Sequence, residues 1–178
     1  MCDKMRRYAR ALFLAFAVAG MATPSHAQTA SPYAEHHFSP AENLEKIDVA
    51  ELAHAMRSID FSAYILTDVA VVDALTAAAE RGVKVRIYRD GNLEAHGGTF
   101  VEAAVDRLAA SRALIRYKSD AAPLMHLKAY CVDGATLRTG SANFSASGLK
   151  RQDNDLVIMR GPLVCEAFNR NFERMFAQ

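Results

Sequence analysis

A histidine and a lysine two residues apart are the strongest candidates for chemistry in this sequence of 178 residues. His126 and Lys128 begin a run of β-prone residues, and side chains two apart on a strand project from the same face. An imidazole beside an ammonium group suits chemistry at phosphorus. The lysine neutralises non-bridging oxygens, and the histidine attacks phosphorus or transfers a proton to the leaving oxygen. The spacing therefore predicts a phosphate-transforming site.

A second group of polar residues follows a predicted hairpin. Asp133-Gly134 lies between two β-prone runs, which is a strong hairpin signal. The turn would return Gly140, Ser141 and Asn143 to the end of the sheet that carries His126. There the hydroxyl, the amide and the backbone N–H groups can form an oxyanion cradle around the substrate. Asp133 itself is interpreted as a structural turn residue.

Hydrophobic periodicity predicts the elements that position these residues. Strands are expected at 33–38, 59–65, 83–88, 114–117, 127–132, 135–139 and 155–159, and helices at 48–57, 69–81, 99–110 and from 162 onward. Asp48 and Glu51 have capping-box spacing, which predicts that the first helix begins at Asp48. The order of elements predicts an α/β sandwich with a mixed central sheet and helices on both faces.

Residues outside the central motif are weaker candidates. Residues 89–98 follow the carboxyl end of a predicted strand, so Arg89 and His96 are expected to bind substrate, with a polar surface loop as the alternative. The pair Lys150-Arg151 either attracts a phosphate polymer or is solvated surface. Phenylalanines four residues apart on the last helix are interpreted as core: Phe168, Phe172 and Phe176.

The first 27 residues have the features of a signal peptide. A basic start precedes the apolar run at 11–19, and small residues follow at Ser25 and Ala27. The run is too short to cross a bilayer. We therefore expect export to the periplasm or the medium, no stable membrane anchor, and a single catalytic domain at 28–178. Removing the peptide takes four basic residues and one acidic residue from 21 Lys plus Arg and 20 Asp plus Glu, which leaves a net charge of −2.

Cys131 and Cys165 remain in the expected mature protein. The β-prone run around Cys131 favours a buried free thiol, and a disulfide stays open because spacing alone does not fix its geometry. No CxxC or CxH cluster is present in the sequence, so no metal site is predicted.

The spacing HxKxxxxD from His126 to Asp133, followed after six residues by GSxN from Gly140, resembles the HKD signature of the phospholipase D superfamily. Residues 33–176 are similar to its short bacterial endonucleases. The resemblance implies that His126 is a nucleophile forming a phosphohistidine, and that Lys128 and Asn143 bind phosphate oxygens with support from Ser141. Asp153 falls where relatives usually carry the glutamate that orients the histidine.

Members of this family need two HKD motifs, and this sequence has one. The resemblance therefore implies a homodimer with the active site on its two-fold axis. One imidazole attacks and the other protonates the leaving oxygen, so the pair should titrate together and give a bell-shaped rate profile with pH. No metal or other cofactor is expected.

Three functions follow from this reading. The first is an exported endonuclease acting on DNA or RNA, which the nearly neutral mature charge slightly disfavours. The second is a phospholipase D that removes phospholipid head groups, which the lack of an amphipathic docking helix slightly disfavours. The third is a catalytically silent nucleic-acid-binding module, which has no need of a nucleophile.

Overall fold

The protein is built on one mixed sheet, seen in a computed structural model that describes residues 33–91, 99–119 and 121–178. Within these residues seven strands pair in the order β1-β7-β6-β5-β2-β3-β4. The strands are β1 (Tyr33–Ser39), β2 (Ser58–Ala63), β3 (Lys84–Asp90), β4 (Leu114–Lys118), β5 (Lys128–Val132), β6 (Thr136–Thr139) and β7 (Asn154–Arg160). Strands β2, β3 and β4 are parallel and the other pairs are antiparallel. The predicted α/β class with a mixed central sheet is confirmed.

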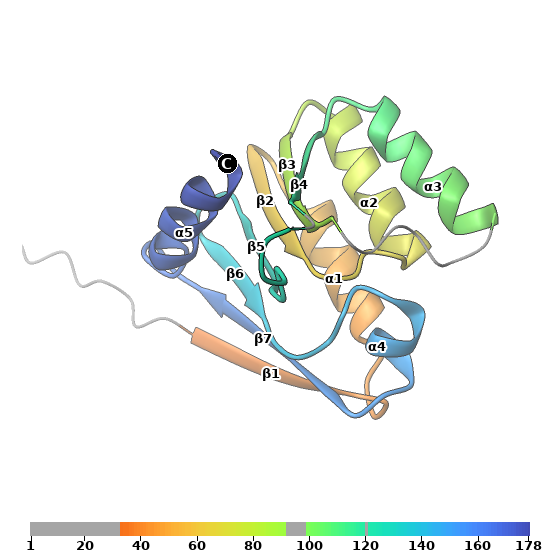
Figure 1. Cartoon of the computed structure of the whole chain (residues 1–178). Helices are drawn as coiled ribbons and strands as arrows, with labels where there is room; N and C mark the ends of the chain where they lie inside the picture. Colours follow the sequence, from red (N-terminus) through yellow and green to blue (C-terminus); the bar gives the residue numbers. More distant parts are fainter. Residues whose placement is uncertain (1–32, 92–98, 120) are drawn as a thin grey trace, which may run out of the picture.

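The helices cover both faces of this sheet, as Figure 1 shows. They are α1 (Leu44–Ala53), α2 (Val69–Glu80), α3 (Thr99–Ala110), α4 (Ala146–Lys150) and α5 (Glu166–Phe176). The main core joins α1, α2 and α3 to one face. On the other face, Phe172 and Phe176 of α5 pack with Tyr88 and Met125, and Phe168 packs against them. The interpretation of these phenylalanines as core is confirmed.

The predicted start of the first helix is wrong. Helix α1 begins at Leu44, and Asn43 is its N-cap, with the side-chain oxygen accepting a hydrogen bond from the Lys46 N–H at 3.3 Å. Asp48 lies in the middle of the helix, fully buried on the same face as Leu44 and Leu52. A carboxylate four residues from each of two leucines faces the core, and its partner is far away in the sequence.

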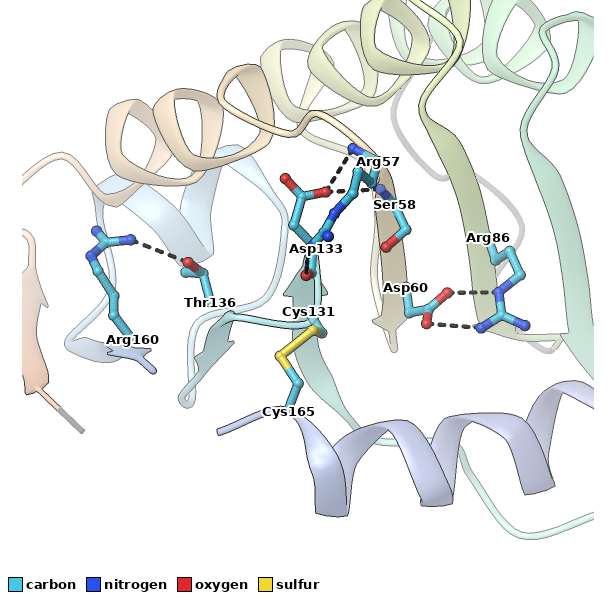
Figure 2. Close-up of a disulfide and its surroundings, with 9 residues drawn as sticks. All are labelled: Arg57, Ser58, Asp60, Arg86, Cys131, Asp133, Thr136, Arg160 and Cys165. Carbon is cyan, nitrogen blue, oxygen red and sulfur yellow. Dashed lines mark hydrogen bonds and ion pairs between the residues drawn. A yellow bond between two sulfur atoms is a disulfide. The ribbon is translucent and has the colours of Figure 1, made fainter. Parts of the chain in front are cut away.

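The β5–β6 hairpin turns at the predicted dipeptide. Asp133 and Gly134 have φ values of 54° and 72°, as a two-residue turn with left-handed central residues requires. The Asp133 carboxylate accepts hydrogen bonds from the N–H groups of Met56, Arg57 and Ser58 at 2.9, 2.7 and 2.9 Å. Burial acts to raise the pKa of Asp133, but these donors hold it below its usual value. Asp133 thus fastens the turn to the start of β2 (Figure 2), in the structural role expected from the sequence.

The two cysteines of the described chain form a disulfide, which corrects the expectation of a free thiol. The Cα atoms of Cys131 and Cys165 are 6.0 Å apart, within the range that a disulfide requires. Cys131 lies on the face of β5 turned toward α5, and Cys165 is the N-cap residue of α5 (Figure 2). The bond therefore ties the last helix to the strand that begins with Lys128.

Removing the disulfide is expected to destabilise the fold. The two cysteines are 34 residues apart, and the chain-entropy relation gives about 4 kcal/mol for a loop of that length. We expect the Cys131→Ser, Cys165→Ser double variant to unfold at a lower urea concentration by a corresponding margin. Wild-type protein in reductant should match the double variant. Coincident urea midpoints for oxidised wild type and double variant would contradict this expectation.

Two expectations concern residues outside the described part of the chain. The signal peptide at 1–27 lies there, and so does His96. Among the described residues, none of the helices has the length and apolar character needed to cross a membrane.

Candidate active site

His126 and Lys128 lie side by side, as their spacing predicts. The Lys128 Nζ is 3.0 Å from His126 Nδ1 and donates to the His126 carbonyl at 2.8 Å. The His126 side chain is exposed, whereas Lys128, the first residue of β5, is 7% exposed. Burial lowers the pKa of Lys128. The pair therefore presents an accessible imidazole beside a buried cation.

Tyr64 completes this contact, and the sequence reading missed it. Its ring centroid is 4.4 Å from that of His126, and Lys128 Nζ lies 4.9 Å from the centre of the same ring. The Tyr64 N–H donates to the Leu127 carbonyl at 2.8 Å, just beyond the end of β2. The only signal was its place near the carboxyl end of a predicted strand, where α/β sheets commonly carry their sites.

The residues of the GSxN segment are held mainly by β7. Gly140 has φ of 147°, and a Cβ there would lie 2.4 Å from the Asp155 carbonyl oxygen, so only glycine fits. Ser141 donates its hydroxyl to Asn154 Oδ1 at 3.0 Å and accepts from the Asp155 N–H at 2.9 Å. The Ser141 N–H also donates to the Asp155 carboxylate at 2.8 Å. These Ser141 hydrogen bonds lower the pKa of Asp155.

The segment around Asn143 joins the same end of β2 as the histidine. The Phe144 carbonyl accepts from the N–H groups of Thr67 and Asp68 at 2.8 and 2.9 Å. Asn143 is half-buried, and its Oδ1 atom accepts no hydrogen bond from the described residues. An unpaired buried polar atom is rare in native proteins and calls for an explanation. Residues 126–128 and 143–144 thus flank the segment that follows β2.

Arg138 connects the backbone segment that carries Lys128 to the segment that carries Asn143. Its guanidinium donates to the Lys128 carbonyl at 2.8 Å and to the Ala142 carbonyl at 3.3 Å. Asp48 pairs with the same guanidinium at 3.0 and 3.1 Å and accepts from the Tyr130 hydroxyl at 3.0 Å. Arg138 and Asp48 are both 0% exposed. The sequence reading identified neither partner.

Asp153 lies on the surface. The structure shows it exposed, with no hydrogen bond to His126 or to any other described residue. Its neighbour Asn154 instead engages Ser141 and donates to the Gly148 carbonyl at 3.1 Å. Within one chain the His126 ring therefore faces Lys128 and Tyr64 rather than a carboxylate.

Two of the remaining basic candidates, Arg89 and Lys150, are not free surface side chains. Arg89 is the penultimate residue of β3 and is 4% exposed, so it belongs to the sheet rather than to a surface loop. Lys150 forms ion pairs with Glu45 and, at 3.5 Å, with Asp68. A lysine engaged by two carboxylates is poorly placed to attract a polyanion. In the described part of the chain, no cluster of three or more His, Cys, Asp or Glu side chains is arranged to hold a metal ion.

A family model and several curated proteins match most of the chain. A family model described as "Cardiolipin synthase, PLD-like domain" matches residues 49–176. The chain is 31% identical over 137 residues to a phospholipase D of Rickettsia conorii, covering 76% of this chain and 65% of that protein. It is 23% identical over 130 residues to the mitochondrial cardiolipin hydrolase of Xenopus laevis, covering 73% of this chain and 60% of that protein. The chain thus spans just under two thirds of the curated relatives described here.

Solved structures give a more complete match. The phospholipase D family member Nuc from Salmonella typhimurium superposes with a TM-score of 0.74 and 28% identity, over 83% of this chain and 96% of that one. NucT from Helicobacter pylori superposes with a TM-score of 0.71 at 17% identity, over 83% of this chain and 97% of that one. The second likeness concerns the fold alone.

Proposed function

Because the chain belongs to the phospholipase D superfamily, we propose that it is a metal-independent phosphodiesterase that cleaves DNA or RNA through a phosphohistidine at His126. The observation that carries this proposal is the exposed imidazole of His126 with the Lys128 ammonium 3.0 Å from its Nδ1. The resemblance to short bacterial endonucleases favours a polynucleotide substrate. So does the match to Nuc, which extends over 96% of that chain.

In the proposed reaction His126 attacks phosphorus and the bond to the leaving oxygen breaks, with the electron pair passing to that oxygen. A second imidazole donates the proton that the leaving oxygen requires. Water then attacks the phosphohistidine, the P–N bond breaks, and the second imidazole takes the proton from water. Lys128 and the Asn143 amide stabilise the charge on the non-bridging oxygens.

A second copy of the chain supplies the second imidazole in this proposal, so the functional unit is a homodimer with His126 of each copy at the two-fold axis. The Lys128 Nζ atom lies 3.0 Å from Nδ1 of His126, a contact that does not by itself fix the tautomer of the ring. A nucleophilic imidazole needs its proton held on one nitrogen while the other carries the free electron pair. An exposed carboxylate from the second copy suits that task, and Asp153 is exposed and free of hydrogen bonds among the described residues.

We further propose that the protein acts outside the cytoplasm. The signal-peptide features of residues 1–27 support this location. The Cys131–Cys165 disulfide supports it independently, because such bonds form and persist mainly in oxidising compartments.

The decisive assay offers single-stranded DNA, RNA and phosphatidylcholine vesicles to the purified dimer in parallel, each with and without EDTA. We expect cleavage of the polynucleotides and an EDTA effect below about twofold, because a lysine and hydrogen-bond donors carry the phosphate charge. Head-group release from vesicles with intact polynucleotides would overturn the substrate assignment. Loss of turnover in EDTA would overturn the metal-independent mechanism.

A phospholipase D acting on phospholipid head groups is the second candidate. The curated relatives carry the names phospholipase D and mitochondrial cardiolipin hydrolase. Two exposed leucines also flank the histidine, Leu124 at 56% and Leu127 at 37% exposure. Apolar side chains beside the reacting group would contact acyl chains at a membrane surface. The vesicle arm of the assay tests this candidate directly.

A further inference from the structure

Arg89 shares one face of the sheet with the catalytic lysine. In the pairing of β2 with its two neighbours, Ala63 lies opposite Lys128 on one side and opposite Arg89 on the other. Residues directly opposite in neighbouring strands project from the same face. The side chains of Lys128 and Arg89 therefore flank the small methyl group of Ala63. Lys128 begins β5 level with the carboxyl end of β2, and Arg89 lies near the carboxyl end of β3, at the edge that carries the site.

Arg89 has no carboxylate partner among the described residues, whereas three other arginines of the chain do. Arg86 and Arg160 each pair with two carboxylates, and fully buried Arg138 pairs with one. Arg89 is 4% exposed, forms no ion pair in the described part of the chain, and leaves its Nε without a hydrogen-bond partner. Burial of a charge without a partner is costly. A buried guanidinium that has no counter-ion among the described residues and lies beside a catalytic lysine points to an anionic ligand.

An exposed aromatic ring extends this row of residues. Tyr117 of β4 lies opposite Arg89 in the sheet, and its ring centre is 5.8 Å from the Arg89 guanidinium carbon. The Tyr117 side chain is 55% exposed, whereas Arg89 beside it is buried. Aromatic rings beside a basic groove stack the bases of single-stranded nucleic acids. The row Lys128, Ala63, Arg89, Tyr117 therefore offers two cations and then a stacking surface.

The distances suit two phosphates rather than one. Neighbouring strands lie about 4.8 Å apart, so two strand spacings place the Cα atoms of Lys128 and Arg89 about 10 Å apart. A polynucleotide strand carries one phosphate charge for every nucleotide. With the scissile phosphate at Lys128, Arg89 is the nearest cation in this row of residues for a neighbouring phosphate of the same polynucleotide. A phosphatidylcholine molecule has a single phosphodiester and leaves Arg89 unused.

We propose that Arg89 binds the phosphate adjacent to the scissile one and that Tyr117 stacks the attached base, so that the site takes a single-stranded polynucleotide across at least two phosphates. This inference rests on the proposed nuclease function and gives the path of the bound polynucleotide across the sheet. The bound polynucleotide would run from β5 across β2 and β3 toward the β4 edge of the sheet. Arg89 and Tyr117 act on binding rather than on the bond that breaks.

The test compares one substrate that has neighbouring phosphates with one that has none. The full chain, its Arg89→Met variant and its Tyr117→Leu variant are assayed on a single-stranded oligodeoxynucleotide and on bis(p-nitrophenyl) phosphate. We expect Arg89→Met to lower kcat/KM for the oligonucleotide at least about tenfold, through KM, and to leave the small diester within about twofold. Its salt dependence should be shallower by about 0.7 in logarithmic slope, as for one lost single-strand phosphate contact. Tyr117→Leu should weaken oligonucleotide binding without changing that slope.

A matched control and a stability measurement separate this role from a structural one. Arg107→Met removes the same charge from the surface of α3, where Arg107 pairs with Asp73, and should leave the oligonucleotide kinetics unchanged. Arg89→Met should unfold at the same or a higher temperature than wild type, because it removes a buried charge that has no counter-ion among the described residues. An equal loss on both substrates, no loss on either, or a lowered unfolding temperature would overturn the assignment of Arg89. Wild-type protein that hydrolyses bis(p-nitrophenyl) phosphate but leaves the oligonucleotide intact would instead overturn the proposed nuclease function itself.

Discussion

Replacing His126 by asparagine is expected to abolish turnover while the fold remains intact. The imidazole is exposed, and its contacts are with the Lys128 ammonium and the Tyr64 ring rather than with the core. In a dimer the same substitution removes both the nucleophile and the general acid. We therefore expect kcat to fall by at least about 10⁴-fold, with an unchanged unfolding temperature. Steady-state kinetics and thermal unfolding of the purified variant check this result.

His54→Asn is the matched control, because His54 is an exposed histidine beyond the end of α1. It should retain wild-type kinetics and the bell-shaped pH profile expected of two coupled imidazoles. The shared site can be tested by subunit exchange. An equal mixture of wild type and His126→Asn should keep about a quarter of the wild-type activity rather than half, because each mixed dimer has only one imidazole. Half the activity, or substantial turnover by the variant alone, would contradict the two-histidine mechanism.

Replacing Arg138 by methionine is expected to have the largest effect on stability. Arg138 is fully buried with Asp48, and its guanidinium also binds the Lys128 and Ala142 carbonyls. The substitution leaves the Asp48 carboxylate buried without its cation, which typically costs about 3–5 kcal/mol. It also frees the two backbone segments that carry Lys128 and Asn143. Urea unfolding should show the loss, and kcat should fall in whatever fraction remains folded.

The double variant Asp48→Leu, Arg138→Met separates the two effects. Replacing both members of a buried ion pair by apolar residues is often close to neutral for stability, so most of the unfolding free energy should return. The carbonyls of Lys128 and Ala142 still lack their shared donor. We therefore expect the double variant to fold but to turn over slowly. Full recovery of turnover together with stability would show that Arg138 does not position the site.

The parts of the site that depend on local spacing could be predicted from the sequence. Two-residue periodicity was enough to place Lys128 beside His126, and the Asp133-Gly134 dipeptide was enough to fix the hairpin. The place of Asp48 could not be found in this way. Its capping-box spacing is a local signal, whereas its burial depends on Arg138, 90 residues away in the sequence.

The remaining differences also have a tertiary origin. The disulfide depends on how closely α5 approaches β5, which spacing in the sequence does not fix. The apparent loop position of Arg89 became a buried strand position because β3 extends to Asp90. Tyr64 had no motif of its own, and its contact with His126 follows from the pairing of β2 with β5.

The edge of the sheet also sets when this protein can fold. Strand β1 forms its only strand pairing with β7, from Tyr33 opposite Arg160 to Ser39 opposite Asn154, among the described residues. The first of the described strands in the sequence therefore pairs with one that is made more than a hundred residues later. Pairings this distant in sequence slow folding, because the entropy cost of closing a long loop is met before the stabilising contacts form. Until β7 is made, β1 lacks the strand that it pairs with in the described part of the chain, so completion of this edge of the sheet is a late step of folding.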